Sequence, residues 1–373
     1  FFSCLIYGFL VLFIEEKIQY VRFSIYFLVW IICLASTLIY GHLSVRDYSS
    51  YKQTKIAAIQ NNEDPTQNGL LVAKNNIQSL IDLTNEAIDI SPDIDIVLWP
   101  ETSVLPAIQY HYTQKKDNTR YVIVNSILQF INKKNQTFVI GNGHIKTDNN
   151  DNILGTYNSA LVFYPQKNVI PPNPLVYSKV HLVPYSEHFP YKEKLPFLYN
   201  LIVKDESLFW DAGNEYVCFT DVNSHNIDFN FSVPICFEDT FSKTGREMYK
   251  NGARAFLNMS NDAWSKSESC QYQHLAMAVF RSVENRVPSV RSTSSGQTCS
   301  IDPNGIITNM AQPFSKTYIV TSIPTIEQNR KMTVYCKVGD ICGNGCVILA
   351  LVLLLSKIII VIIKRVKAHN NKI

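Results

Sequence analysis

The sequence contains 373 residues with a formal net charge of +3 and a pI near 8.3. This length allows one large domain with extra segments, and the small net charge gives no sign of a nucleic-acid partner. Cysteines and histidines show no zinc-ligand spacing, and we expect neither a metal nor another cofactor. The nine cysteines lie at positions 4, 33, 218, 236, 270, 299, 336, 342 and 346.

Two long apolar stretches flank the centre of the chain. Residues 23–45 contain no charged side chain other than a possible charge on His42, and they are long enough to cross a bilayer core of about 30 Å. Residues 341–363 are similar except for Lys357, which can snorkel to the headgroups. Both stretches predict transmembrane helices. The apolar residues 1–14 resemble the end of a further span, because no basic region or cleavage site marks them as a signal peptide.

The charges beside these stretches predict the topology. The short segment 15–22 and the tail 364–373 are both basic in part, and cationic flanks stay in the cytoplasm. We therefore expect a multi-pass membrane protein whose residues 46–340 form an extracytoplasmic domain, with a cytoplasmic tail. Disulfides are permitted outside the cytoplasm, although an odd count leaves at least one cysteine unpaired.

The pattern of residues 46–340 predicts one α/β domain with a layered, mixed sheet. Apolar strands alternate with amphipathic helices, and the sequence DPNG marks a hairpin turn. The Pro-rich stretch 169–177 is predicted to be a loop. Predicted strands cover 54–60, 94–100, 136–144, 157–165, 227–235, 253–260, 288–295 and 317–323, and predicted helices cover 68–88 and 270–286.

Cys236 follows a predicted strand in the sequence FSVPICFEDTF. Apolar residues alternate with polar ones up to Val233, while Asp239 and Thr240 are typical of a helix start. A cysteine at such a turn is exposed at the sheet edge, where a helix N-terminus favours the nucleophilic thiolate. The alternative is a buried structural cysteine, which is the commoner use of a free thiol.

Three other motifs place polar residues beside strands. Glu101 in WPET lies just past an apolar strand, where open α/β sheets place their sites. Lys179 and Glu187 belong to YSKVHLVPYSEHFP, and Trp264 belongs to NMSNDAWSKS. Taken singly, Glu101 also fits a solvated loop carboxylate, and Lys179 and Glu187 fit an ordinary charged loop. Trp264 also fits an aromatic ring packed beneath a capped turn.

Together these motifs resemble the nitrilase superfamily. The segments WPET, KVHLVPYSE, ICFED, SNDAW, QYQHLAMAVFRSVENRVP and RSTSSGQT occur in that order and cover the central domain. With apolar spans on both sides, the whole chain is similar to the apolipoprotein N-acyltransferases, the integral membrane branch. It departs from them at Ser265 and Lys266, where many members have Phe-Gly, so the shape of this loop and the acyl-chain preference do not follow from the resemblance.

The resemblance implies an αββα sandwich domain inserted between transmembrane helices, with a Glu-Lys-Cys triad. Cys236 would be the nucleophile, Glu101 the base that takes its proton, and Lys179 the cation that stabilises the oxyanion. The Phe237 amide would assist Lys179. Glu187 would orient Lys179, and Glu238 would have a supporting role.

The implied reaction passes an acyl chain from a phospholipid to Cys236 as a thioester, and then to the α-amino group of the N-terminal diacylglyceryl-cysteine of a lipoprotein. The implied location is the bacterial inner membrane, in contact with membrane lipids, and we expect a monomer. Trp99, Trp264 and Phe189 are candidate substrate-binding residues. Two alternatives remain: a membrane-tethered amidase that hydrolyses a small amide, and a non-enzymatic receptor domain on the same scaffold.

Overall fold

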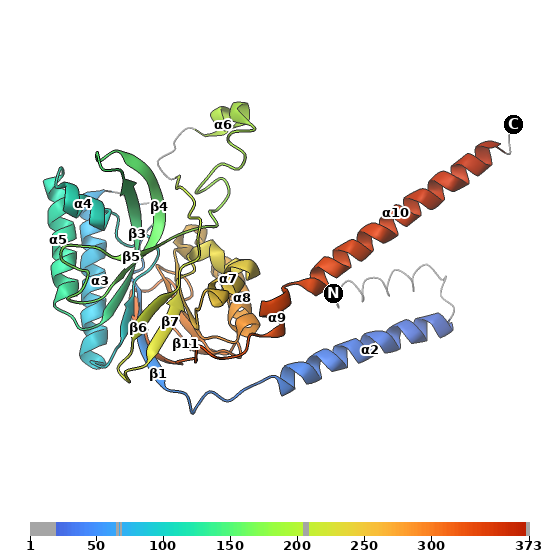
Figure 1. Ribbon diagram of the computed structural model, residues 1–373, viewed down its shortest axis with the longest axis horizontal. Coiled ribbons are helices and arrows are strands. Elements are labelled where there is room, and N and C mark those ends of the chain that lie inside the picture. The colour runs from blue at the N-terminus through green and yellow to red at the C-terminus, as the bar shows by residue number, and fades with distance from the viewer. Residues whose placement is uncertain (1–19, 65–66, 68, 204–208, 371–373) are drawn as a thin grey trace. The chain divides into compact units, whose positions relative to one another are not determined.

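Two β-sheets pack face to face between layers of helices (Figure 1). The computed structural model describes residues 20–64, 67, 69–203 and 209–370. Within them, the first sheet has the order β12-β1-β2-β3-β4-β5 and the second has the order β11-β10-β9-β8-β7-β6. The first comprises β1 (Gln53–Gln60), β2 (Ile96–Leu98), β3 (Thr137–Thr147), β4 (Ile153–Phe163), β5 (Leu175–Ser178) and β12 (Thr317–Pro324). The second comprises β6 (Phe219–Val222), β7 (Asp228–Ser232), β8 (Ala255–Ser260), β9 (Ser289–Thr293), β10 (Cys299–Ile301) and β11 (Ile307–Met310).

Each sheet has a parallel centre with antiparallel edges. Strands β1, β2 and β3 are parallel in the first sheet, and β7, β8 and β9 are parallel in the second. The remaining pairs are antiparallel. Ligand sites in α/β proteins form beyond the carboxyl ends of parallel strands. The candidate residues Glu101 and Cys236 follow β2 and β7 at such ends.

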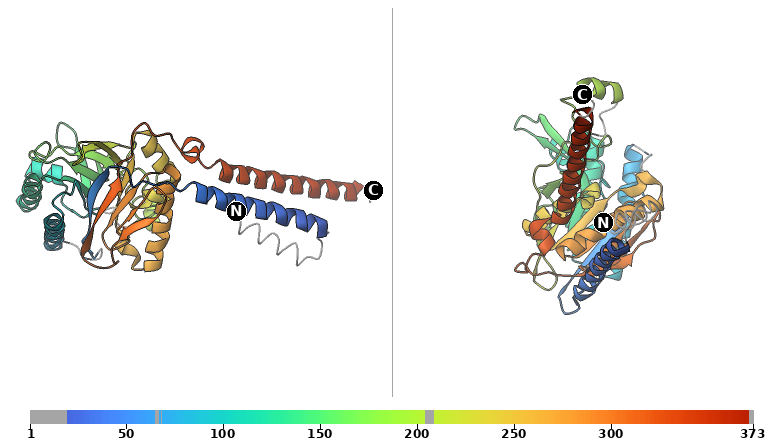
Figure 2. Two further views of the ribbon diagram at one scale, coloured as in Figure 1. Left: turned by 90° about the horizontal axis from the view of Figure 1, so that it is seen from below. Right: turned by 90° about the vertical axis from the view of Figure 1, so that its right-hand side faces the viewer.

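Helices cover the outer faces of both sheets (Figures 1 and 2). The first sheet carries α3 (Leu70–Ile90), α4 (Ile108–Gln114) and α5 (Asn118–Asn132), and the second carries α7 (Ser242–Lys250) and α8 (Glu268–Asn285). The short helices α6 (Pro196–Ile202) and α9 (Val334–Val338), and the 3-10 turns η1 (Cys236–Thr240) and η2 (Asp262–Ser265), lie in connections. The layer order is therefore αββα, as the resemblance implied.

The alternation of side chains along β1 builds two separate cores. Ile56 and Ala58 face the second sheet and pack in the same cluster as Phe231. Ala57 and Ile59 face the helices and pack with residues of α3 and α5. Because both faces of the strand are covered, its sequence is apolar at consecutive positions instead of alternating with polar residues.

Most predicted strands and helices are confirmed, and the differences lie in the connections. Helices α4 and α5, between β2 and β3, were not predicted. The prediction of a loop at 169–177 is wrong at its C-terminal end. There β5 begins at Leu175 and pairs with β4 from Ser159 to Val162. A proline-rich sequence hid this strand, which lies at the sheet edge, where prolines next to a strand are tolerated.

The candidate membrane segments are observed as helices. Among the described residues, one stretch, Ile341–Lys364 in α10 (Ile341–Asn370), is long and apolar enough to cross a membrane. Helix α2 (Tyr20–Leu43) contains a shorter apolar part, Phe27–Leu43. The predicted span 23–45 is thus largely helical, while its insertion into a membrane stays a prediction. The predicted span end at 1–14 lies outside the described residues.

The chain divides into two compact units, Phe1–Ser50 and Tyr51–Ile373. Helix α2 belongs to the first unit, and both sheets belong to the second. The eight cysteines of the described chain all have free thiols.

Gly141 on β3 allows the backbone of the WPET turn to approach the sheet closely. A Cβ at this position would overlap the Pro100 carbonyl oxygen and lie 2.7 Å from Glu101 Cα. Gly141→Ala should therefore destabilise the protein by about 1–3 kcal/mol, the usual cost of overpacking. Thermal unfolding of the purified protein measures this effect. Gly143→Ala is the control, because a Cβ there would meet the Trp210 side chain at 3.2 Å, which has more freedom to shift. Equal midpoints for the two variants would contradict the argument.

Candidate active site

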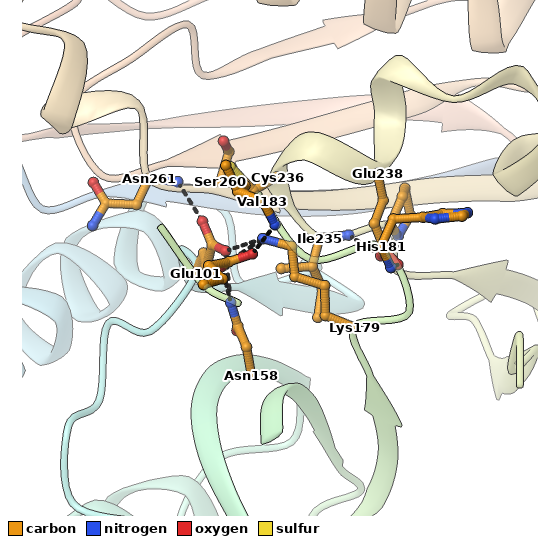
Figure 3. A network of polar contacts seen from close by, with 12 residues as sticks. Glu101, Asn158, Lys179, His181, Val183, Ile235, Cys236, Glu238, Ser260 and Asn261 are labelled. Carbon is orange, nitrogen blue, oxygen red and sulfur yellow. Dashed lines mark hydrogen bonds and ion pairs between the residues drawn. The ribbon is translucent and has the colours of Figure 1, made fainter. Parts of the chain in front are cut away.

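Glu101 enters the space between the sheets from the carboxyl end of β2. Its side chain is buried, with 6% of its surface exposed, which excludes a solvated loop carboxylate. Oε1 accepts hydrogen bonds from Asn158 Nδ2 at 2.8 Å and from Lys179 Nζ at 3.1 Å. Oε2 accepts from the Asn261 backbone amide at 2.9 Å. Glu101 therefore touches groups from both sheets (Figure 3).

Lys179 follows β5 and is fully buried. Its Nζ lies 3.1 Å from Glu101 Oε1 and 2.8 Å from Glu187 Oε1. Burial alone lowers the pKa of Lys179, but the Glu101 carboxylate, Cys236 and Glu187 outweigh burial and raise this pKa above its ordinary value. The side chain is a fixed ammonium ion. It is not part of a solvated charged loop, which was the alternative to the predicted catalytic role.

Cys236 begins η1, where the chain turns out of the second sheet. Its backbone has a φ of 49°, a left-handed conformation that is uncommon outside glycine and often found at functional sites. The side chain is half-buried and lies above Glu101 and beside Ser260 (Figure 3). Burial raises the pKa of the Cys236 thiol and Glu101 raises it further, whereas Lys179 and the Ser260 hydroxyl lower it.

The raised pKa of Cys236 corrects one expectation from the sequence. A helix N-terminus was expected to favour the thiolate, but α7 begins only at Ser242, and the cysteine lies in a 3-10 turn of five residues. The resting side chain is a neutral thiol. A base must therefore take its proton when it reacts, and Glu101 is the nearby carboxylate.

Glu238 connects the cysteine turn to the lysine loop. It is fully buried, and its carboxylate accepts hydrogen bonds from the amide of Ile235 (2.8 Å) and the hydroxyl of Tyr177 (2.8 and 2.9 Å). The amides of Val180 and His181 also donate to it, at 2.8 and 3.1 Å. Because these donors lie on both sides of the site, Glu238 fixes the distance between the turn that carries Cys236 and the segment that carries Lys179.

Glu187 and Asn158 complete the contacts around Lys179. Glu187 Oε2 accepts from the Val183 amide at 2.8 Å, which closes the loop after Lys179. Asn158 Nδ2 donates to Glu101 and, at 3.2 Å, to Glu187. Asn158 was not found from the sequence, although an amide side chain in the interior of a predicted strand was a signal.

The remaining predicted residues lie in different surroundings. Phe237 is half-buried and packs edge-on against Phe241, with ring centroids 4.8 Å apart; the role of its amide stays a prediction. Trp264 is 63% exposed in η2, three residues after Asn261, and a substrate contact there also stays a prediction. It is not packed beneath the turn.

Phe189 is buried between the rings of Tyr185 and Tyr199, so it acts first in packing its own loop.

Trp99 was wrongly predicted to bind substrate. Its indole is fully buried in the core between the first sheet and its helices, and Nε1 donates to Thr84 Oγ1 at 3.0 Å. Successive side chains at the end of a strand point to opposite faces of the sheet. Trp99 therefore points away from the second sheet, where the cysteine lies.

The departure at Ser265 and Lys266 has a visible backbone consequence. Lys266 ends η2 with a φ of 47°, in the left-handed region that glycine adopts without steric cost. The chain keeps the turn that a glycine would favour, and the Ser265 hydroxyl donates to the Asp262 carbonyl at 3.0 Å within it.

A buried carboxylate, a buried ammonium ion and a half-buried cysteine are groups that can carry out acyl transfer through a thioester. The carboxylate can move a proton, the thiol can attack a carbonyl carbon, and the cation can stabilise the resulting oxyanion. The chain belongs to the carbon-nitrogen hydrolase family, whose sequence pattern matches residues 55–331. In fold it is similar to Saccharomyces cerevisiae Nit3, a member of branch 10 of the nitrilase superfamily. That match has a TM-score of 0.50 and 19% identity, and covers 75% of this chain and 93% of Nit3.

Two relatives place the chain more narrowly, among the apolipoprotein N-acyltransferases. It is 39% identical over its whole length to Apolipoprotein N-acyltransferase 1 of Treponema denticola, of which it covers 69%. It is 40% identical over 75% of its length to Apolipoprotein N-acyltransferase 1 of Treponema pallidum, of which it covers 51%. The chain thus spans between half and about two thirds of these relatives' length.

Burial of Lys179 predicts a large effect of its removal on stability. Lys179→Met would leave the Glu101 and Glu187 carboxylates without their cation, and breaking a buried pair costs about 3–5 kcal/mol. A surface ion pair would cost at most about 1 kcal/mol. Chemical denaturation measures the free energy of unfolding. The double variant Lys179→Met/Glu187→Gln also removes one of the two unpaired negative charges, and it should recover part of the lost stability. A loss below about 1 kcal/mol in the single variant would contradict the buried ion network.

Proposed function

We propose that this chain carries the catalytic centre of an apolipoprotein N-acyltransferase that works through a thioester on Cys236. The observation that carries the proposal is the convergence of Glu101, Lys179 and Cys236 between the two sheets. Family membership supports the type of reaction. The acyl donor is a phospholipid, and the acceptor is the α-amino group of the N-terminal diacylglyceryl-cysteine of a lipoprotein.

In the first step, Glu101 takes the proton of the Cys236 thiol as the sulfur attacks the ester carbonyl of the phospholipid. The tetrahedral intermediate carries an oxyanion, which the Lys179 ammonium stabilises. The ester C–O bond then breaks, and the protonated Glu101 gives its proton to the departing alcohol oxygen. The products are an acyl-cysteine thioester and a lysophospholipid.

In the second step, the free amine of the lipoprotein attacks the thioester carbonyl. Glu101 takes a proton from the attacking nitrogen, and Lys179 again faces the oxyanion. The C–S bond breaks, and the Cys236 sulfur recovers the proton from Glu101. The product is an amide, and the enzyme returns to its starting state.

Both substrates are anchored in lipid, which fits the apolar parts of this chain. The stretch Ile341–Lys364 has the length and composition of a span. The loop after Lys179 exposes large apolar side chains, among them Phe197 at 80% and Leu201 at 65%. We propose that the chain lies in the bacterial inner membrane, crosses it more than once and places the catalytic domain outside the cytoplasm.

Acylation of Cys236 is the direct test. Incubating the detergent-solubilised protein with phospholipid should give an intact mass larger by one acyl chain, and peptide mapping should place it on Cys236. Cys236→Ser should give no adduct, because an unactivated hydroxyl is a far weaker nucleophile. Cys270→Ser is the matched control and should keep the adduct, since Cys270 is an exposed thiol on α8.

Two outcomes would contradict this chemistry. Glu101→Gln cannot accept the thiol proton and should slow acylation by about 10²- to 10⁴-fold. An unchanged rate would remove Glu101 from the reaction. Release of free fatty acid at the same rate with and without a lipid amine acceptor would indicate a hydrolase instead of an acyltransferase.

Charge flanks predict the sidedness, and the exposed Cys270 provides a reporter for it. A membrane-impermeant maleimide added to spheroplasts of cells producing the protein should label it, and Cys270→Ser should remove that part of the signal. A reporter protein that works only in the cytoplasm should be active when it is fused after residue 373. Labelling of Cys270 only after lysis would place the domain inside and exclude the proposed acceptor.

A further inference from the structure

Four buried charged residues lie together behind the cysteine turn, and the mechanism above does not use them. They come from four elements: Asp239 from η1, Asp262 from η2, His274 from α8 and Arg291 from β9. Arg291 is fully buried, and the side chains of Asp239, Asp262 and His274 are 3%, 7% and 14% exposed. We call this group the charge ring.

The contacts alternate in sign around the ring. His274 Nε2 lies 2.8 Å from Asp239 Oδ1, and His274 Nδ1 lies 2.9 Å from Asp262 Oδ1. Arg291 forms an ion pair with Asp239 and lies 3.7 Å from Asp262 Oδ2. Each carboxylate therefore faces both cations. With all four groups ionised, the ring has no net charge.

The geometry requires His274 to carry both ring protons. A carboxylate only accepts hydrogen bonds, and a neutral imidazole has a single N–H. Nδ1 makes its hydrogen bond with the Asp262 carboxylate, and Nε2 makes its hydrogen bond with the Cys236 carbonyl oxygen beside Asp239. Because neither oxygen can donate, only the imidazolium can donate to both. Burial lowers the pKa of His274, but Asp239 and Asp262 outweigh burial and raise this pKa to about 10, so the charge persists at neutral pH.

The ring is joined to both the nucleophile and the base. His274 Nε2 also lies 3.3 Å from the backbone carbonyl oxygen of Cys236, and Asp239 belongs to the same 3-10 turn. On the other side, Asp262 directly follows Asn261, whose amide donates to Glu101. The Asp262 carboxylate raises the pKa of the Cys236 thiol. Unless a positive charge neutralises this carboxylate, its negative charge opposes the formation of a thiolate on Cys236.

We propose that His274 is a positioning residue whose fixed positive charge neutralises Asp239 and Asp262, so that the nearby Cys236 can lose its proton. The inference rests on the proposed role of Cys236 and adds a residue to that site. His274 does not touch the reacting atoms and acts through the two carboxylates and the Cys236 carbonyl. It differs from a general base, because it never gives up its proton during the reaction.

The pH dependence of Cys236 alkylation tests the charge directly. Chloroacetamide reacts with the thiolate, and peptide mass spectrometry separates Cys236 from the other cysteines. His274→Gln keeps one donor but leaves the ring with a net negative charge. We expect the alkylation midpoint to move to higher pH and the rate at neutral pH to fall about tenfold, which corresponds to a shift of about one pH unit. His144→Gln on β3, a buried histidine outside the ring, should leave the profile unchanged.

A double variant separates charge from shape. His274→Gln/Asp262→Asn removes one positive and one negative group, which restores the neutral ring without restoring the native contacts. We expect this variant to recover most of the tenfold loss. If His274 only packs α8 against the turn, the double variant will react as slowly as the single variant or more slowly, and the proposal is overturned. A folded His274→Gln protein with the wild-type alkylation profile would also overturn it.

A measurement on the wild-type protein covers the case in which His274→Gln does not fold. The ¹⁵N spectrum of histidine-labelled protein should show one imidazole with both nitrogens protonated at neutral pH and up to about pH 9, well above the ordinary histidine range. A neutral imidazole on His274 at pH 7 would refute the proposal. None of these measurements needs an acyl donor, so failure of the acyl-transfer assay and failure of the charge ring are distinguishable.

Discussion

The site depends on an ammonium ion buried between two sheets. Removing a lysine and two carboxylates from water costs several kcal/mol per ion, and their mutual attraction offsets this cost only when the other lone pairs are also satisfied. Here Asn158 and the amides of Val183 and Asn261 supply those hydrogen bonds. Since these donors come from different strands and loops, Lys179 reaches its position only when both sheets have packed together.

The cysteine turn is held from two sides by different means. On one side, the single carboxylate of Glu238 gathers a tyrosine hydroxyl and three backbone amides. On the other side, the charge ring contacts the Cys236 carbonyl through His274. The turn keeps a left-handed residue at its first position, a conformation that is stable only when the surroundings determine it. The two networks provide such surroundings and hold Cys236 close enough to Glu101 for the carboxylate to raise the pKa of its thiol.

The fold is shared with carbon-nitrogen hydrolases, so in the proposed mechanism the outcome of the reaction would depend on what reaches the thioester. Water completes a hydrolysis, while an amine completes a transfer. The exposed apolar residues of the loop after Lys179 would favour contact with lipid, and a lower water activity around the thioester would favour the amine. Under the proposed mechanism, access to the site, more than the identity of the catalytic groups, would separate the two types of enzyme.

The sequence by itself determined the elements that carry the site. A consecutive apolar run ending at WPET identified β2, alternating apolar residues ending at FSVPIC identified β7, and polar residues at the ends of these strands identified Glu101 and Cys236. Tertiary structure decided what those residues became. Burial of Lys179 depends on β5, which a proline-rich sequence concealed, and the side of the sheet that receives Trp99 depends on which face α3 covers. The charge ring joins positions 239, 262, 274 and 291, whose proximity arises only when α8 packs beside the ends of β8 and β9. Local periodicity carries no information about such contacts, since they join residues far apart in the chain.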